Sequence, residues 1–154
     1  MSEPTPTALR ARYAPARGEP AWLRRLRDDA IAQFEAQGFP TSRLEDWKYT
    51  AAPARAIAQA ELDPVASRPS LAGPVHALAS ELRGLEGRLG SLADSKRDAF
   101  VALNTAFFDD GAAVVVPRDS ALDAPALVRF EAGAGMSSPR LWIDAEPGSR
   151  GVVV

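Results

Sequence analysis

The stretch FPTSRLEDWKYT, residues 39–50, combines a helix stop, a helix start and three aromatic side chains. Pro40 prevents a preceding helix from continuing, because proline lacks a backbone N–H and clashes with the turn before it. Ser42 and Glu45 have the S-x-x-E form of a capping box, which predicts a short helix that begins at Arg43. The stretch therefore indicates a folded junction between two helices rather than a solvated linker.

We expect Trp47 and Tyr49 to supply most of the local burial energy of this junction. We expect Trp47 to anchor the short second helix on the helix before it, because large aromatic side chains dominate local burial. A binding platform for a partner is the functional alternative for the same side chain. Glu45 and Lys48 are spaced to form an i,i+3 ion pair, which contributes only a few tenths of a kcal/mol.

Upstream of the junction, the sequence predicts one long helix over residues 21–37. Pro20 precedes its first turn, and Gly38 lies where a left-handed C-cap is expected. An apolar stripe with spacings of three and four runs along it, formed by Leu23, Leu26, Ala30 and Phe34. Residues 1–20 contain four prolines and predict a flexible N-terminal arm.

Downstream, the helical signal is weaker until residue 95. Residues 51–74 are rich in alanine and proline, and allow one short helix over 54–60. Residues 75–92 are weakly helical, because three glycines each disfavour a helix by about 1 kcal/mol relative to alanine. Residues 95–108 predict a second long helix, which ends at the turn Asp109-Asp110-Gly111.

After Gly111 the pattern changes to short β-branched runs. Strands are predicted over residues 112–117, 126–131, 140–145 and 151–154, and the first three begin 14 residues apart. Short strands at regular spacing are typical of a sandwich, a barrel or the first coils of a β-helix. Because the last run reaches the end of the chain inside a predicted strand, we expect an N-terminal fragment of a longer protein.

Composition limits the chemistry that this chain can perform. The absence of cysteine excludes disulfides, thiolate zinc sites and thiolate ligation of a cluster by this chain. The single histidine, His76, is expected at the surface or the edge of the core, since a metal site needs several convergent ligands. No G-x-S-x-G elbow or phosphate-binding glycine loop is present. We therefore assign no catalytic, cofactor-binding or metal-binding residue.

Charge and hydropathy argue against nucleic acid and membrane partners. The net charge is −2, and no apolar run approaches the roughly 20 residues that cross a bilayer. Because the N-terminus lacks a basic segment followed by an apolar one, a cytoplasmic location is expected. Residues 1–27 carry a local charge of +4 from six arginines and two glutamates. A solvated arginine-rich helix face is the simpler interpretation, and a docking patch for an acidic partner is the alternative.

Three blocks of the sequence resemble the SufD subunit of the Suf iron–sulfur cluster assembly machinery. The most specific is residues 39–50, which is similar to the family's "FPT…EDWKYT" signature. Residues 100–117 are similar to a passage in which a helix leads into the first β-helix strand. Residues 138–140, Ser-Pro-Arg, resemble the family's "HPR" segment, with serine at the histidine-like position.

The resemblance implies an α+β fold, in which a helical N-terminal domain is followed by the first strands of a right-handed parallel β-helix. The implied division is an arm over residues 1–20, a helical domain over 21–110 and a truncated β-helix domain over 111–154. The implied function is that of a non-catalytic scaffold subunit, which pairs with a SufB-like subunit and a SufC-like ATPase. An iron–sulfur cluster is implied for the intact complex, and none is implied for this chain alone.

Two other functions compete with the scaffold interpretation. A stand-alone helical interaction module would dock a partner through its arginine-rich face, and its binding would be sensitive to salt. A β-helical carbohydrate-active enzyme would use a carboxylate pair, for which Asp109 and Asp110 are the candidates. The turn at Gly111 already explains both aspartates, so we predict that the chain is not an enzyme.

Overall fold

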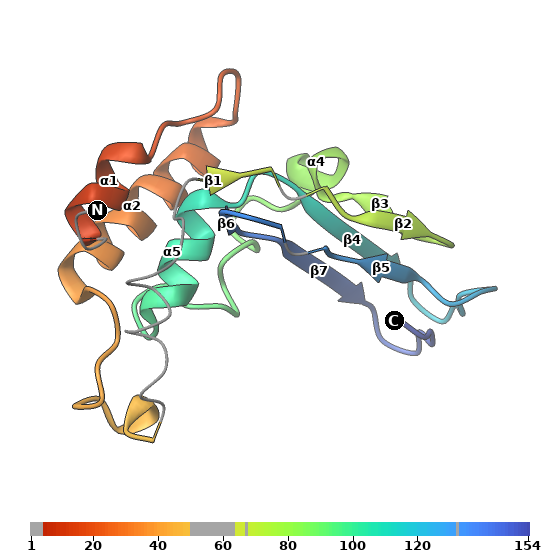
Figure 1. Cartoon of the computed structure of the whole chain (residues 1–154). Coiled ribbons are helices and arrows are strands. Elements are labelled where there is room, and N and C mark those ends of the chain that lie inside the picture. The colour runs from red at the N-terminus through yellow and green to blue at the C-terminus, as the bar shows by residue number, and fades with distance from the viewer. Residues whose placement is uncertain (1–4, 50–63, 67, 132) are drawn as a thin grey trace. The chain divides into compact units, whose positions relative to one another are not determined.

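The computed structural model describes residues 5–49, 64–66, 68–131 and 133–154, and these form two compact units (Figure 1). The helical unit comprises Met1–Val65, Gly87–Phe107 and Ala134–Met136. The sheet unit comprises Ala66–Glu86, Phe108–Gly133 and Ser137–Val154. Each unit therefore draws on stretches that are far apart in the sequence.

In the described residues of the helical unit, three α-helices pack together: α1 (Pro6–Arg12), α2 (Ala21–Gln37) and α5 (Ala99–Phe107). Both α1 and α5 pack against α2, and α2 and α5 share the larger contact (Figure 1). Their common core consists of Leu9, Ala30, Ile31, Phe34, Ala99, Ala102, Leu103 and Ala106. The alanines keep the helix backbones close together, and the larger side chains fill the space between the helices.

Helix α2 confirms the prediction for residues 21–37, including both ends. Gly38 follows it with φ = 69°, and its N–H donates to the Phe34 carbonyl oxygen at 2.8 Å. A left-handed backbone at this position favours glycine because no Cβ is present to clash. Helix α5 confirms the second long helix but begins at Ala99, since Asp98 Oδ1 accepts hydrogen bonds from the Phe100 and Val101 N–H groups.

Helix α1 occupies part of the predicted flexible arm, so that prediction is wrong for residues 6–12. Thr5 caps the helix by accepting a hydrogen bond from the Ala8 N–H at 3.2 Å, and Pro6 stands in the first turn, where proline is tolerated. Leu9 is fully buried against the core. Pro6, one of the four prolines that suggested an arm, therefore marks the beginning of a helix.

The described part of the junction, residues 39–49, contains a single helical turn, the 3₁₀ turn η1 (Glu45–Trp47). The predicted capping box is wrong, because Leu44 is the N-cap residue and no side chain caps the turn. Successive turn hydrogen bonds connect the segment instead, from the Leu44 N–H to the Thr41 carbonyl and from the Trp47 N–H to the Leu44 carbonyl, both at 3.0 Å. The helical unit also contains β1 (Pro64–Val65), which pairs with β6 (Met136–Ser137).

Two small sheets organise the sheet unit. Strands β2 (Ser70–Ala72) and β5 (Leu127–Arg129) form an antiparallel pair. The second sheet has the order β3-β4-β7, formed by His76–Ala77, Gly111–Val116 and Arg140–Ala145. In it β3 is antiparallel and β7 parallel to the central strand β4. The core packs Val114, Val116 and Ala126 with Val75, Leu122 and Val153.

The predicted right-handed parallel β-helix is not present in the described part of the chain. The strands at residues 112–117, 126–131 and 140–145 form approximately where predicted, and β4 and β7 pair in parallel, but β5 lies in a different sheet and each of the two sheets contains an antiparallel pair. The 14-residue spacing suggested successive rungs, whereas β5 pairs with β2 and β4 pairs with β3, two strands that precede Gly111. The run at residues 151–154 contributes only an isolated bridge between Val153 and Ala126. The fold is therefore a small mixed α/β arrangement.

The weakly helical stretch 75–92 is helical only over α4 (Leu78–Glu81) and the 3₁₀ turn η2 (Leu82–Gly84). Its first residues instead form strand β3, which pairs with β4. Both Gly87 and Gly90 have φ above 70°, as expected for glycines that interrupt a helix. The predicted helix over 54–60 lies outside the described residues.

Candidate protein-interaction surface

The aromatic side chains of the junction contact two different helices of the helical unit. The ring of Phe39 meets Phe34 of α2 edge to face, with centroids 5.2 Å apart and an interplanar angle of 79°. The indole of Trp47 meets Phe100 of α5 at 5.3 Å and 58°. Trp47 is therefore an anchor as expected, but its partner is α5 rather than the helix that precedes the junction. The expected burial of Tyr49 is wrong, because this side chain is 89% exposed.

A cavity of about 380 Å³ lies beside Trp47 within the helical unit. We call it the Trp47 pocket; its apolar wall consists of Pro40, Leu44 and Trp47, and its charged rim includes Asp46, Lys96 and Arg97. The volume falls in the range of roughly 300–1,000 Å³ that is usual for ligand pockets. Leu44 is 53% exposed.

Hydrogen bonds fix the wall of the pocket that precedes α5. The Gln37 Nε2 group, at the end of α2, donates to the Ser95 carbonyl at 3.0 Å and to the Lys96 carbonyl at 3.3 Å. Asp94 Oδ1 accepts from the Lys96 N–H at 2.9 Å, and the Asp94 carbonyl accepts from the Arg97 N–H at 3.1 Å. The backbone that carries both cations is therefore held by the protein itself.

The arginine-rich helix face is only partly solvated. Arg24 and Arg25 are exposed, as the simpler interpretation predicts. Arg27 is 7% exposed, and its Nε lies 3.3 Å from Glu19 Oε2, on a side chain that is 5% exposed. Arg24 Nε is 3.8 Å from the other Glu19 oxygen. Glu19 and Arg27 thus form a buried ion pair within the helical unit, and Arg27 is not available to a partner.

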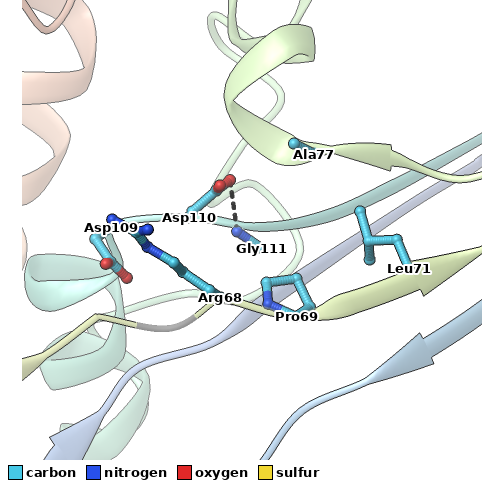
Figure 2. Close-up of a pocket in the computed structure, with 7 residues that line it drawn as sticks. All are labelled: Arg68, Pro69, Leu71, Ala77, Asp109, Asp110 and Gly111. Atoms are coloured by element: carbon cyan, nitrogen blue, oxygen red, sulfur yellow. Dashed lines mark hydrogen bonds between the residues drawn. The ribbon is translucent and has the colours of Figure 1, made fainter.

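Asp109 and Asp110 line a second cavity, of about 460 Å³, within the sheet unit (Figure 2). Asp110 Oδ1 accepts hydrogen bonds from the Ala79 N–H at 3.2 Å and from the Gly111 N–H at 2.8 Å. Figure 2 shows the two carboxylates pointing in different directions, with the Arg68 side chain extending toward Asp109. The Asp110 carboxylate is thus held by backbone N–H groups on both sides of the cavity, as expected for an aspartate that shapes a turn.

The remaining sequence candidates do not assemble into a metal centre. His76 is exposed on β3, opposite Ala113 of β4, which confirms its expected surface position. Among the described residues, no three histidine, aspartate or glutamate side chains lie close enough to hold a metal ion. No helix in the described ranges is long and apolar enough to cross a membrane.

Together these features define a small mixed α/β protein with one pocket beside Trp47 in the helical unit and another beside Asp109 and Asp110 in the sheet unit. The chain belongs to the family described as the SufBD protein N-terminal region, whose sequence profile matches residues 11–57 and 75–128. The matched residues include the junction at 39–50 and the passage at 100–117, and they fall in both units. No curated protein and no solved structure matches the chain.

Proposed function

We propose that this chain acts as a SufD-type, non-catalytic scaffold subunit in iron–sulfur cluster assembly. The match to the SufBD N-terminal region carries the proposal, because that family takes part in Suf cluster assembly and the match covers more than half of the chain. The EDWKYT block at residues 45–50 supports SufD over SufB through its resemblance to the SufD signature.

In this role the chain pairs with a SufB-like subunit, and the pair recruits a SufC-like ATPase in the cytoplasm. The iron–sulfur cluster is the cargo of the complex, and this chain contributes no ligand to it. Two observations favour a non-catalytic role. The chain has no cysteine, and Asp110 is engaged by two backbone N–H groups. This chain then contributes binding surfaces, and ATP hydrolysis belongs to its partner.

Co-expression tests the proposal directly. The chain, carrying an affinity tag, is produced together with untagged SufB-like and SufC-like proteins from the same source, and the co-purified proteins are identified by mass. We expect a heteromeric complex that contains both partners. Recovery of a SufD-like partner in place of the SufB-like one would assign the chain to SufB. A stable monomer that retains neither protein would contradict the scaffold role.

A further inference from the structure

Strand β7 (Arg140–Ala145) is an open edge of the sheet unit. In the order β3-β4-β7 it pairs with β4 on one side, and no described strand pairs with its other side. The backbone N–H and C=O groups of an edge strand can pair with a strand of another chain. Strand β7 is six residues long and contains neither proline nor lysine, two of the residues that usually block such pairing.

The hydrophobic core of the sheet unit is also open at this edge. Leu141 and Ile143 share a face of the sheet with Ala112 and Val114, their partners in register, which are fully buried. The two β7 side chains are nevertheless 39% and 49% exposed. A cavity of about 400 Å³ lies beside Ile143. Further apolar side chains at this edge would therefore be buried against an existing core.

The sequence of β7 is complementary to itself in the antiparallel direction. When two copies pair with Trp142 opposite its equivalent, Leu141 lies opposite Ile143 on the face toward the core. On the other face, the same register places Arg140 opposite Asp144 at both ends of the pairing. Opposite charges in directly facing positions stabilise an antiparallel pair, and like charges destabilise it.

Other ways of pairing the two strands are less favourable. A shift of one residue would place the core face of one copy opposite the other face of its partner, because successive side chains point to opposite sides. A shift of two residues keeps the faces but separates Arg140 from Asp144. Parallel pairing in register would place like charges opposite each other. In the antiparallel register the next charge, Glu146, falls opposite the neutral Ser138.

We propose that two copies of this chain associate through antiparallel pairing of their β7 strands. The pairing joins the two sheets edge to edge about a twofold axis, and both copies use the same surface. This association goes beyond the scaffold role, which concerns other proteins, and it is tested on the chain alone. A contact of one strand from each copy is smaller than a standard interface, so we expect a dissociation constant of about 10–100 µM.

Sedimentation velocity of the full chain, from low micromolar to millimolar concentration, measures the association. Ile143→Lys places a charge at the open edge of the core and is expected to weaken dimerisation at least tenfold. Leu127→Lys is the matched control, because this aliphatic side chain of the sheet unit is 45% exposed and lies on β5. The control should leave the dissociation constant unchanged.

A pair of charge reversals tests the register. Arg140→Asp alone and Asp144→Arg alone each bring like charges together twice in the dimer, and each is expected to weaken dimerisation about tenfold. An equimolar mixture of the two variants restores opposite charges at both contacts, so we expect heterodimers with an affinity similar to that of the parent chain. If either variant loses its fold, as judged by circular dichroism, the comparison of Ile143→Lys with Leu127→Lys still decides the question.

Three results would overturn the proposal. The first is a chain that stays monomeric at millimolar concentration; if such a chain loses a co-purified SufB-like protein on Ile143→Lys, the edge belongs to that partner instead. The second is equal weakening by Ile143→Lys and Leu127→Lys, which would indicate nonspecific association of exposed apolar side chains. The third is a mixture of the two charge variants that associates no more tightly than either variant alone, which would exclude this register.

Discussion

The helical unit and the sheet unit stabilise their cores in different ways. In the helical unit, the large side chains of the core, such as Phe34 and Ile31, are completely buried between helices. In the sheet unit, Val114 is completely buried, whereas Ile143, its partner in register on β7, is 49% exposed. The comparison shows that side-chain packing dominates the first core, while close approach of backbones dominates the second.

The backbone contact in the sheet unit is clearest at Gly111. A Cβ atom at this position would overlap the carbonyl oxygen of Arg140 on β7, so only glycine allows the two strands to pair at this register. The helical unit has no comparable contact at Gly38, where the nearest side-chain atom to an added Cβ would be 3.9 Å away. Substitutions in the two units should therefore act through different physical causes.

The largest expected effect is that of Phe34→Ala in the helical unit. Removing a fully buried ring leaves a cavity beside Phe39 and should lower the free energy of unfolding by about 3–5 kcal/mol. Urea denaturation measures the loss, and hydrogen exchange assigns it to a unit. The same change at Phe130, which is 37% exposed in the sheet unit, should cost about 1 kcal/mol or less. Equal losses at both positions would contradict the comparison.

Gly111→Ala should destabilise the sheet unit by about 3 kcal/mol, because β4 and β7 must separate to accommodate the new methyl group. Hydrogen exchange should show faster exchange in β4 and β7, with α2 unchanged. Gly84→Ala is the matched control: no atom lies within 4 Å of the position that the new methyl group would take, and the change should be neutral or slightly stabilising. A stable Gly111→Ala protein would show that this backbone contact does not define the sheet.

Arg27→Met tests the buried ion pair of the helical unit. The substitution leaves the carboxylate of Glu19 buried with only the more distant Arg24, and should destabilise the protein by about 3 kcal/mol. Adding Glu19→Gln removes the stranded charge and should recover a large part of that loss in urea denaturation. If the losses in free energy of unfolding caused by the two substitutions instead add independently, Glu19 and Arg27 are not energetically coupled.

The smallest expected effect is that of Tyr13→Phe. The Tyr13 hydroxyl donates to Asp28 Oδ1 at 2.8 Å, and its loss should cost about 1 kcal/mol near neutral pH. Burial, and then the hydrogen bond to Asp28, raise the pKa of the Tyr13 phenol above its ordinary value of about 10. The unfolded phenol therefore ionises first, so the stability that Tyr13 contributes is complete below about pH 10 and decreases above it.

Denaturation of the Tyr13→Phe variant and the parent protein between pH 7 and pH 11 checks this dependence. The difference in the free energy of unfolding between the parent protein and the Tyr13→Phe variant should shrink as the pH rises above about 10. Tyr49→Phe serves as the control because Tyr49 is 89% exposed. Its free energy of unfolding should equal that of the parent protein throughout this pH range. A difference that is constant with pH would contradict the proposed role of the Asp28 hydrogen bond.

Sequence periodicity predicted the elements whose signals are local. The helix over residues 21–37 forms at the predicted residues, since Pro20, Gly38 and the apolar stripe all belong to it. The strand over residues 140–145 also forms as predicted. The failures at residues 6–12 and at the capping box of Ser42 and Glu45 were local, whereas the failed β-helix prediction depended on partners that are distant in the sequence. Strand β5 pairs with β2, and no spacing among the later strands could reveal that partner.

The candidate site also combines features that the sequence indicates locally with features that depend on distant residues. The aromatic character of residues 39–50 and the resemblance to the SufBD family were both accessible from the sequence. The Trp47 pocket was not, because Lys96 and Arg97 lie about 50 residues beyond Trp47 along the chain. The only local signal near these cations was the expected start of the second long helix. Likewise, the arginine pattern did not distinguish the buried Arg27 from the exposed Arg25.

The sequence by itself determined the long helices, the end of α2 at Gly38, the approximate strand positions and the family. These features depend on neighbouring residues, on backbone preferences or on motif identity. Only the tertiary structure decided the pairing of the strands, the partner of Trp47, the burial of Glu19 with Arg27 and the need for glycine at position 111. Each of these depends on a contact between distant segments, whose geometry exists only after the chain has folded.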